Sequence, residues 1–382
     1  MLRHLINRQT KLTWMGPSPG ESKKAALLIP QYNEGRNNNF ERRLEYFDDL
    51  ARLHWDRMDV ILIDDGSTDD SLQRLVDYRE KQGGAFFIAS VTPNGNKVGA
   101  LFISAVSVIH EIIILSDFDT DLAGIDELIS GKFGDFMEDT SLMGYYFRML
   151  PHEGSGLVFF FQQLEYSLQR VLYKFHQNER SVRVMPGAGS CYKREILLSI
   201  YDQHSGLRNG EDREATLIGL KLGYKTTYQN KILALTRPPL SFRSLVKQRV
   251  RWNLGYLETF TKESAYYFRE MGRFSRIGIL TMIDVAIISF VLLFPFLTIL
   301  IAVISLRQLL IFFASSYIVT FIWYLNLLFI SPEESEEFKE KRVVLMFLYP
   351  FFKITLDFLA WSAAIYKMMR RSFKQSSLWT TE

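Results

Sequence analysis

The stretch from Val285 to Leu306 constrains the fold more than any other, because none of its 22 residues carries a charge. About 20 consecutive apolar residues are enough for a helix to cross the hydrocarbon core of a bilayer. A second uncharged run, Leu309 to Ile330, follows after only two residues, and we expect the two runs to form a helical hairpin. This concentration of apolar residues predicts transmembrane helices towards the C-terminal end.

A third candidate span, Val343 to Tyr366, is interrupted by Lys353 and Asp357, whose i, i+4 spacing allows them to pair. No window before residue 277 is long and apolar enough to cross, and residues 1–24 lack the apolar region of a secretory signal. We therefore expect the preceding domain to lie on the cytoplasmic side, which agrees with the basic residues that directly precede the first span. The basic C-terminal end also favours the inside, so the number of crossings stays open.

Charge and cysteine count exclude several classes of site. A formal net charge of +3 on 382 residues is too small to indicate a nucleic-acid partner. Cys191 is the only cysteine, which excludes an intrachain disulfide and a metal held by several cysteines, and we expect it to be a packed small side chain. The six histidines are scattered, so any metal ion should be held by carboxylates.

The first part of the chain alternates between two kinds of segment. Short apolar runs predict buried parallel strands at Ala25–Pro30, Asp59–Asp64, Ala85–Val91 and Ile112–Ser116. Segments of helical character lie between them, at Phe40–His54, Asp69–Gln82 and Lys97–His110. This alternation predicts a doubly wound α/β sheet, in which ligands bind beyond the carboxyl ends of the strands.

Polar residues follow each predicted strand, at Gln31–Glu34, Asp64–Asp69, Pro93–Lys97 and Asp117–Asp121. Each cluster also has an ordinary structural interpretation, because Asp-Gly-Ser-Thr-Asp is typical of a turn with a helix cap and Pro-Asn-Gly-Asn of a plain turn. Their regular placement at successive strand ends favours one shared site.

The residue types at these strand ends suit a nucleotide diphosphate. Asp117 and Asp119 leave a strand on the same side, so both can reach one hard cation such as Mg²⁺ or Mn²⁺. A cation held there can bridge a diphosphate and stabilise its departure. Lys97, near a helix start, can neutralise phosphate as well.

A basic segment from Ser241 to Trp252 connects this domain to the apolar helices. In a helix, Gln248, Arg251 and Trp252 would share one face and present an amide, a guanidinium and an indole. These groups can orient a hydroxyl, grip phosphate and stack on a sugar ring. Alternatively, the segment is an interfacial helix whose basic residues meet lipid headgroups, and both interpretations can hold together.

Five motifs occur in one order, namely Pro30-x-Tyr32-Asn33-Glu34, Asp64-Asp65-Gly66-Ser67-Thr68-Asp69, Asp117-x-Asp119, Gly210-Glu211-Asp212 and Gln248-x-x-Arg251-Trp252. This set, within residues 25–255, resembles the family 2 inverting glycosyltransferases, particularly the membrane branch with the cellulose, chitin and hyaluronan synthases. The resemblance implies a GT-A fold, a divalent metal and a nucleotide-sugar donor, commonly UDP-linked.

The resemblance also implies roles for individual residues. By this resemblance, Tyr32, Glu34 and Asp65 would contact the base and the ribose of the donor. Asp117 would contact the ribose or the diphosphate, and Asp119 would bind the metal ion. Asp212 matches the residue that serves the family as general base. Gln248, Arg251 and Trp252 match the element that shapes the acceptor end and holds the diphosphate.

Two features near Asp212 affect what the resemblance implies about this end of the site. An acid in the first turn of a helix, such as Asp212, is also favoured by the helix dipole alone. Gly210 departs from the family pattern, in which Thr is usual at this position. The departure weakens what the resemblance implies about the shape of the acceptor but not about the base.

We therefore predict a GT-A catalytic domain of the doubly wound α/β class followed by transmembrane helices. We expect an N-terminal tail at residues 1–24 and the catalytic domain at residues 25–238. Interfacial amphipathic helices with the Gln248–Trp252 element should follow at residues 239–276. Two to four transmembrane helices should occupy residues 277–366, and a basic tail residues 367–382. The predicted protein is a multi-pass membrane hexosyltransferase, metal-dependent and inverting, that acts on a lipid-linked or growing glycan acceptor.

Three alternatives remain at this point. The first is a processive polysaccharide synthase that works as a homo-oligomer or with an export subunit, since two or three crossings are few for a product conduit. The second is a catalytically inactive family member that acts as a scaffold. The third is a nucleotidyltransferase, which shares the sheet and the metal-binding acids but has no need of the Gln248–Trp252 element.

Overall fold

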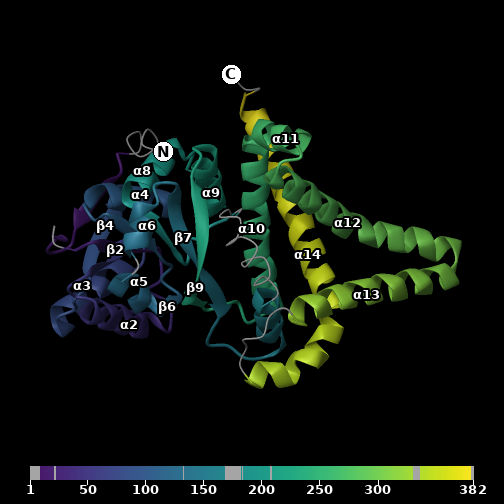
Figure 1. Ribbon diagram of the computed structural model, residues 1–382, viewed down its shortest axis with the longest axis horizontal. Coiled ribbons are helices and arrows are strands. Elements are labelled where there is room, and N and C mark those ends of the chain that lie inside the picture. The colour runs from purple at the N-terminus through teal and green to yellow at the C-terminus, as the bar shows by residue number, and fades with distance from the viewer. Residues whose placement is uncertain are drawn as a thin grey trace. The chain divides into compact units, whose positions relative to one another are not determined.

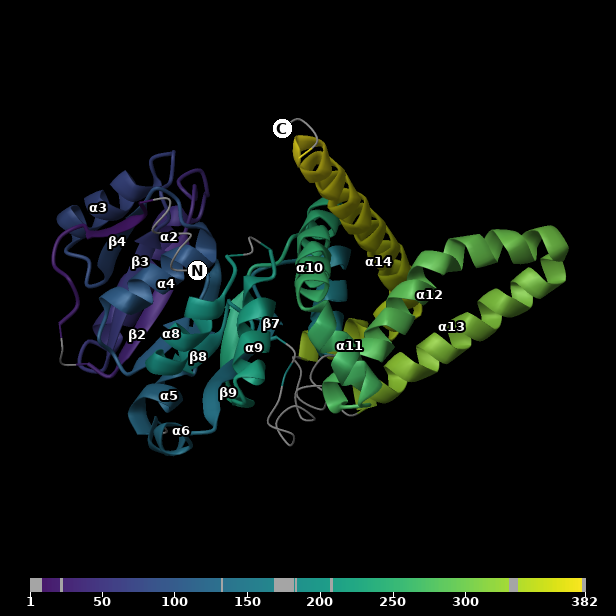
Figure 2. The ribbon, with the colours of Figure 1, turned by 90° about the horizontal axis from the view of Figure 1, so that it is seen from above.

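The computed structural model describes residues 9–20, 23–131, 133–167, 182, 184–206, 209–329 and 336–379. The chain divides into two compact units (Figures 1 and 2). The first unit comprises Met1–Leu150 and His176–Arg237, and the second comprises Pro151–Phe175 and Pro238–Glu382. The predicted catalytic domain thus largely corresponds to the first unit, although residues 151–175 group with the helices of the second.

Within the described residues, the first unit contains a nine-stranded mixed sheet in the order β1-β4-β3-β2-β5-β8-β7-β9-β6. The strands are β1 Lys11–Trp14, β2 Ala25–Gln31, β3 Met58–Asp64, β4 Phe87–Thr92, β5 Ile112–Leu115, β6 Thr120–Ala123, β7 Leu142–Pro151, β8 Ser190–Lys193 and β9 Lys225–Thr236. The helices of this unit are α2 Phe40–Leu53, α3 Ser71–Gln82, α4 Asn96–Ser107, α5 Ile125–Gly131, α6 Phe133–Glu138, α8 Arg194–Gln203 and α9 Glu211–Lys221.

Strands β2 to β5 confirm the predicted parallel arrangement, with bounds within two residues of those expected. Strand β2 pairs in parallel with β3 and β5, and β3 with β4. Ala25, Leu27 and Ile29 pack with α2 in one core, and the intervening Ala26 and Leu28 are fully buried as well. A strand buried on both faces needs a continuous apolar run, which explains why these four strands were recognisable.

The rest of the sheet is antiparallel and was not predicted. Strand β8 pairs antiparallel with β5 and β7, and β6 with β9. The segment Lys11–Trp14, which falls in the predicted N-terminal tail, forms an edge strand antiparallel to β4. Its residues alternate between exposed and half-buried, because an edge strand covers the sheet on one face only.

The second unit is helical in its described part. Its helices are α10 Phe242–Lys262, α11 Ser264–Gly272, α12 Arg276–Ile304, α13 Leu306–Phe329 and α14 Glu336–Trp379, together with residues 157–167. Helices α12 and α13 form the predicted hairpin (Figures 1 and 2). Two described helical segments, Arg276–Ile304 and Leu345–Arg370, are long and apolar enough to cross a membrane. The described apolar part of α13, Leu306–Ile322, is shorter.

A group of four charges, two of them buried and two half-buried, connects α10 to α14 inside this unit. One carboxylate oxygen of Glu165 accepts a hydrogen bond from Arg249 Nη2 at 2.6 Å, and the other lies 3.3 Å from Lys353 Nζ. Lys353 also pairs with Asp357 at 2.7 Å, as its spacing predicted. Two cations and two anions therefore balance one another between the apolar clusters of the two helices.

We expect Glu165→Ala to destabilise the second unit by about 3–5 kcal/mol, because the change leaves Arg249 and Lys353 with a single half-buried anion. Thermal unfolding of the purified protein in detergent measures the effect. Lys247→Ala, which removes an exposed charge from the same helix α10, serves as the control and should change the midpoint little. Equal midpoints for the two variants would contradict a structural role for the charge group.

Candidate active site

The loops after β2 and β3 are joined by short polar side chains. The amide of Asn33 donates to Ser67 Oγ at 2.9 Å, and its side-chain oxygen accepts from the Thr68 amide at 2.7 Å. The Asp69 carboxylate accepts from the amides of Gly35 and Ser71, both at 3.1 Å. Asp69 therefore connects the first residue of α3 to the loop of Tyr32 and Glu34, whereas Asp70, the N-cap residue of α3, makes no side-chain cap hydrogen bond.

Asp65 connects the next pair of loops. It is buried, and its Oδ1 accepts a hydrogen bond from the Gly95 amide at 2.7 Å, while Asn94 Nδ2 donates to its backbone oxygen at 2.6 Å. Gly66 has φ +68°, and a Cβ at this position would lie 3.0 Å from the Asn94 amide nitrogen. The Asp-Gly pair therefore brings the loops after β3 and β4 into close contact, which only glycine permits.

The residues expected to bind the nucleotide base, Tyr32, Glu34 and Asp65, lie in these loops after β2 and β3. The side chain of Tyr32 is 44% exposed. Glu34 Oε2 accepts from Asn37 Nδ2 at 3.2 Å, and its charge acts on Asp119. Their contacts with a base or ribose stay predictions, as does that of Asp65.

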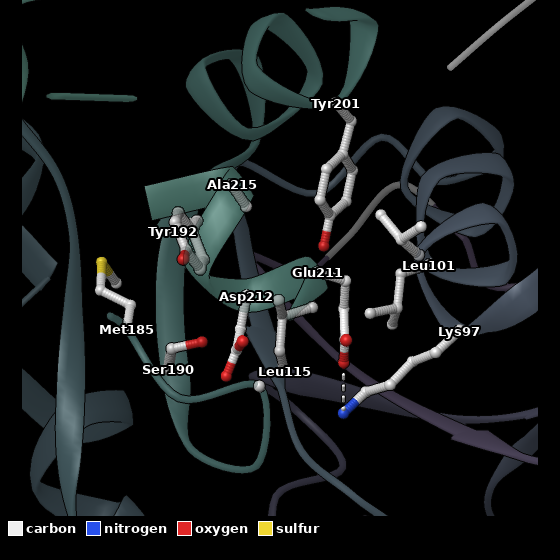
Figure 3. A pocket seen from close by; sticks show the side chains of 12 residues that line it. Lys97, Leu101, Leu115, Met185, Ser190, Tyr192, Tyr201, Glu211, Asp212 and Ala215 are labelled. Carbon is white, nitrogen blue, oxygen red and sulfur yellow. Dashed lines mark ion pairs between the residues drawn. The ribbon is translucent and has the colours of Figure 1, made fainter. Parts of the chain in front are cut away.

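A charged cluster forms where α4, the loop after β5 and the start of α9 meet (Figure 3). Lys97 Nζ lies 2.5 Å from Asp117 Oδ1 and 3.6 Å from Glu211 Oε1. Asp212 lines the same small pocket as Lys97 and Glu211. The structure thus brings Lys97, Asp117 and Asp212 together, and it adds Glu211, to which the sequence analysis assigned no role.

The electrostatic balance of this cluster favours a charged lysine. Desolvation alone would lower the pKa of Lys97, but the negative charges of Asp117, Glu211 and Asp212 outweigh it and raise that pKa. Burial also raises the pKa of Glu211. Lys97 therefore stays cationic across the physiological range and can face an incoming phosphate.

Gly187 belongs to the segment Pro186–Gly189 that leads into β8. A Cβ on Gly187 would lie 2.9 Å from Lys97 Nζ and 3.9 Å from the Asp212 Cβ. The segment therefore passes directly over the charged cluster. Beyond this segment Cys191 is fully buried in β8, which confirms that it is a packed side chain.

Asp117 and Asp119 stand on a tight turn between β5 and β6. The Thr120 amide donates to the Asp117 carbonyl oxygen at 3.1 Å, and Phe118 between the two acids is buried against Phe40 and Phe47. Crowding by protein atoms and the negative charge of Asp117 raise the pKa of Asp119 to about 6, although Asp119 is exposed on its open side. Water on that side screens part of the repulsion between the two acids.

The two carboxylates fit a hard divalent cation. Oxygen ligands of this type suit Mg²⁺ and Mn²⁺, and the contact of the Lys97 ammonium with Asp117 shows that the site already attracts positive charge.

Asp212 lies in the first turn of α9, and its Oδ1 accepts from the Arg213 amide at 2.8 Å. The buried Glu214 accepts from the amide and hydroxyl of Ser205, at 3.0 and 2.7 Å, and so anchors this turn from below. Gly210 precedes the helix at φ +70°. This left-handed backbone explains why glycine replaces Thr here, since a β-branched residue would be strained.

Gln248, Arg251 and Trp252 lie on α10 in the second unit and share one face, as predicted. Arg251 is exposed and Gln248 is half-buried. Trp252 is 46% exposed, and its ring packs against the Arg249 guanidinium at 4.1 Å. Arg249, which the sequence analysis did not single out, therefore supports the indole from within the helix.

A family match covers part of the segment that carries this site. Residues 26–122, which carry the loops from Tyr32 to Asp119, match glycosyl transferase family 2. The match places these residues in that family and leaves the rest of the chain outside it. The mixed α/β sheet is that of the GT-A fold, as the motifs implied. Asp212 and the Gln248–Trp252 element lie beyond the matched residues.

Two relatives are described as N-acetylglucosaminyltransferases. The one from Mesorhizobium japonicum is 25% identical over 256 residues, covering 59% of this chain and 54% of the relative. The one from Bradyrhizobium diazoefficiens is 24% identical over 251 residues, covering 59% and 47%. The chain thus spans about half the length of these relatives.

Among solved structures, the chain is similar to a mannosyltransferase from Pyrobaculum calidifontis, described in complex with GDP-mannose and Mn²⁺. The two chains are 16% identical, with 93% of this chain and 90% of the other covered and a TM-score of 0.49.

Proposed function

We propose that this protein is a membrane-anchored inverting glycosyltransferase that transfers a sugar from a nucleotide-diphosphate sugar to a hydroxyl group of a lipid-linked or growing glycan acceptor. The observation that carries the proposal is the meeting of Lys97, Asp117 and Asp212 at the carboxyl ends of the parallel strands. One cation and several carboxylates at this position suit a phosphorylated donor and a proton transfer. The names of the two relatives support N-acetylglucosamine as the sugar.

The reaction needs one displacement. Asp212 accepts the proton of the acceptor hydroxyl while the hydroxyl oxygen attacks the anomeric carbon of the donor. The bond from that carbon to the diphosphate breaks, its electron pair stays on the diphosphate oxygen, and the configuration of the carbon inverts. Lys97 then exchanges part of its contact with Asp117 for the diphosphate, whose charge it neutralises.

Asp119, with Asp117 beside it, would hold the Mg²⁺ or Mn²⁺ ion. When bound, such an ion supplies positive charge that stabilises the departing diphosphate. Tyr32, Glu34 and Asp65 would bind the nucleoside, because their loops are held together at the same edge of the sheet.

The Gln248–Trp252 element would position the acceptor. An exposed guanidinium and a half-exposed indole on one helix face offer a phosphate contact and a stacking surface. The helices that follow are apolar enough to anchor the chain in a membrane, with the catalytic domain on the cytoplasmic side, and a lipid-linked acceptor would be within reach from that surface.

Membranes that contain the full chain can test the proposal with a panel of radiolabelled UDP- and GDP-sugars. We expect label from UDP-N-acetylglucosamine in a lipid-extractable product, together with release of UDP. Membranes with Asp212→Asn are the control. Labelled polymer would favour a processive synthase, release of pyrophosphate would indicate a nucleotidyltransferase, and failure with every donor would refute the proposal.

A further inference from the structure

Arg43 on α2 is a buried arginine that the reaction proposed above does not use. Its side chain is 2% exposed, on the helix face that also buries Phe40, Leu44 and Phe47. An arginine is almost never buried in this way unless its donors are paired, because the desolvated charge is costly. The partners of Arg43 therefore indicate what it is for.

All of these partners belong to the turn that carries Asp117 and Asp119. Nε donates to the Phe118 carbonyl oxygen at 2.6 Å, and Nη2 donates to the Thr120 carbonyl oxygen at 2.9 Å. Nη1 pairs with the carboxylate of Asp121. The three nitrogens of the planar guanidinium thus pair with three residues of this turn, namely Phe118, Thr120 and Asp121.

The surroundings hold the guanidinium itself in place. The rings of Tyr46 and Phe47 lie 4.7 and 4.8 Å from its central carbon. The Tyr46 hydroxyl also accepts from the Leu122 amide at 2.6 Å. Helix α2 therefore grips the turn through more than one side chain, and none of these contacts uses the carboxylates of Asp117 or Asp119.

Arg237, at the end of β9, grips the same turn from another element. Its Nη1 donates to the Asp119 carbonyl oxygen at 3.1 Å, and its guanidinium pairs with Asp121 at 3.1 Å. Asp121 lies between the two guanidinium groups and neutralises them in part. The backbone of the turn is therefore held by its carbonyl oxygens, and neither guanidinium group contacts the carboxylates of Asp117 and Asp119.

We propose that Arg43 is a positioning residue that holds the Asp117–Asp121 turn in the conformation that presents Asp117 and Asp119 to the metal and the donor diphosphate. This inference rests on the proposed function for the identity of the ligand, but the hold on the turn is independent of it. A flexible turn would have to be ordered on each binding event, and a turn fixed in advance avoids that cost.

Arg43→Lys tests the inference without removing the charge that faces Asp121. A lysine ammonium is a point charge that cannot make the three forked hydrogen bonds, so the turn loses its support while the fold is kept. We expect hydrogen exchange at the Thr120 and Leu122 amides to become about tenfold faster, the effect of losing one hydrogen bond to a charged group. Binding of UDP with Mn²⁺, measured by calorimetry, should weaken about 10- to 100-fold.

Arg52→Lys is the matched control, because Arg52 lies on the same helix but pairs with Asp48 and the Gly83 carbonyl oxygen. Unchanged exchange at the two turn amides in Arg43→Lys would overturn the inference. If exchange rises but binding of UDP with Mn²⁺ stays at the wild-type level, Arg43 has no role in presenting the acids. If the wild type binds neither UDP nor GDP with Mn²⁺, the proposed function fails, and the exchange comparison still decides whether Arg43 holds the turn.

Discussion

Asp212→Asn should lower the rate of sugar transfer by about 10²- to 10⁴-fold, the usual contribution of a general base. The amide that replaces the carboxylate has nearly the same shape and keeps an oxygen to accept from the Arg213 amide, so α9 should still form. It cannot take a proton from the acceptor hydroxyl at neutral pH. Initial rates with saturating donor and acceptor measure the effect.

Two comparisons make the result specific. Glu195→Gln changes an exposed acid in the first turn of α8, and should leave the rate close to that of the wild type. The affinity of Asp212→Asn for UDP with Mn²⁺ should also stay close to the wild-type value, because the lost step follows donor binding. Full activity in Asp212→Asn would show that Asp212 is not the general base. Glu211, which lines the same pocket, would then be the next acid to test.

Asp119→Asn should weaken metal-dependent donor binding by more than the 10- to 100-fold that is typical of residues that only support a metal ligand. The reason is that Asp119 would itself provide a charged oxygen ligand, whereas an amide oxygen is neutral. EDTA should abolish transfer by the wild type, and Mn²⁺ or Mg²⁺ should restore it. Calorimetric titration with UDP and Mn²⁺ measures the affinity of the variant.

The raised pKa of Asp119 gives this prediction a pH dependence. Because burial and Asp117 raise that pKa to about 6, protons compete with the metal ion at a higher pH than for an ordinary carboxyl group. Metal affinity should therefore be full near pH 8 and fall as the pH drops through about 6. Asp126→Asn, at an exposed acid outside the site, should keep the wild-type profile. A flat profile for the wild type would argue against Asp119 as the ligand.

Local patterns were sufficient for one half of the sheet and not for the other. Strands β2 to β5 are short apolar runs, and such runs are recognisable without any partner. Strand β9 begins with a mostly polar run, Lys225 to Lys231, and its apolar half pairs with β6. Strand β1 likewise needs β4 beside it to be a strand at all.

The candidate site was predictable to a similar extent. The polar clusters after the strands, the two acids of the turn and the Gln248–Trp252 face follow from spacing along the chain, since each lies within a few residues. The contact of Lys97 with Glu211 could not be predicted from spacing, because the two residues come from different helices. Arg43 was missed for the same reason, as an arginine in an amphipathic helix is typical of a solvent-facing position.

The sequence by itself therefore determined the parallel strands, the order of the motifs and the apolar C-terminal helices, because each of these depends on residues close together in the chain. Only the tertiary structure decided which charges meet. Arg43 and Phe118 are 75 positions apart, and Glu165 and Arg249 are 84 positions apart. A buried charge is stable only beside its partner, and the partner is known once the elements that carry the two have packed together.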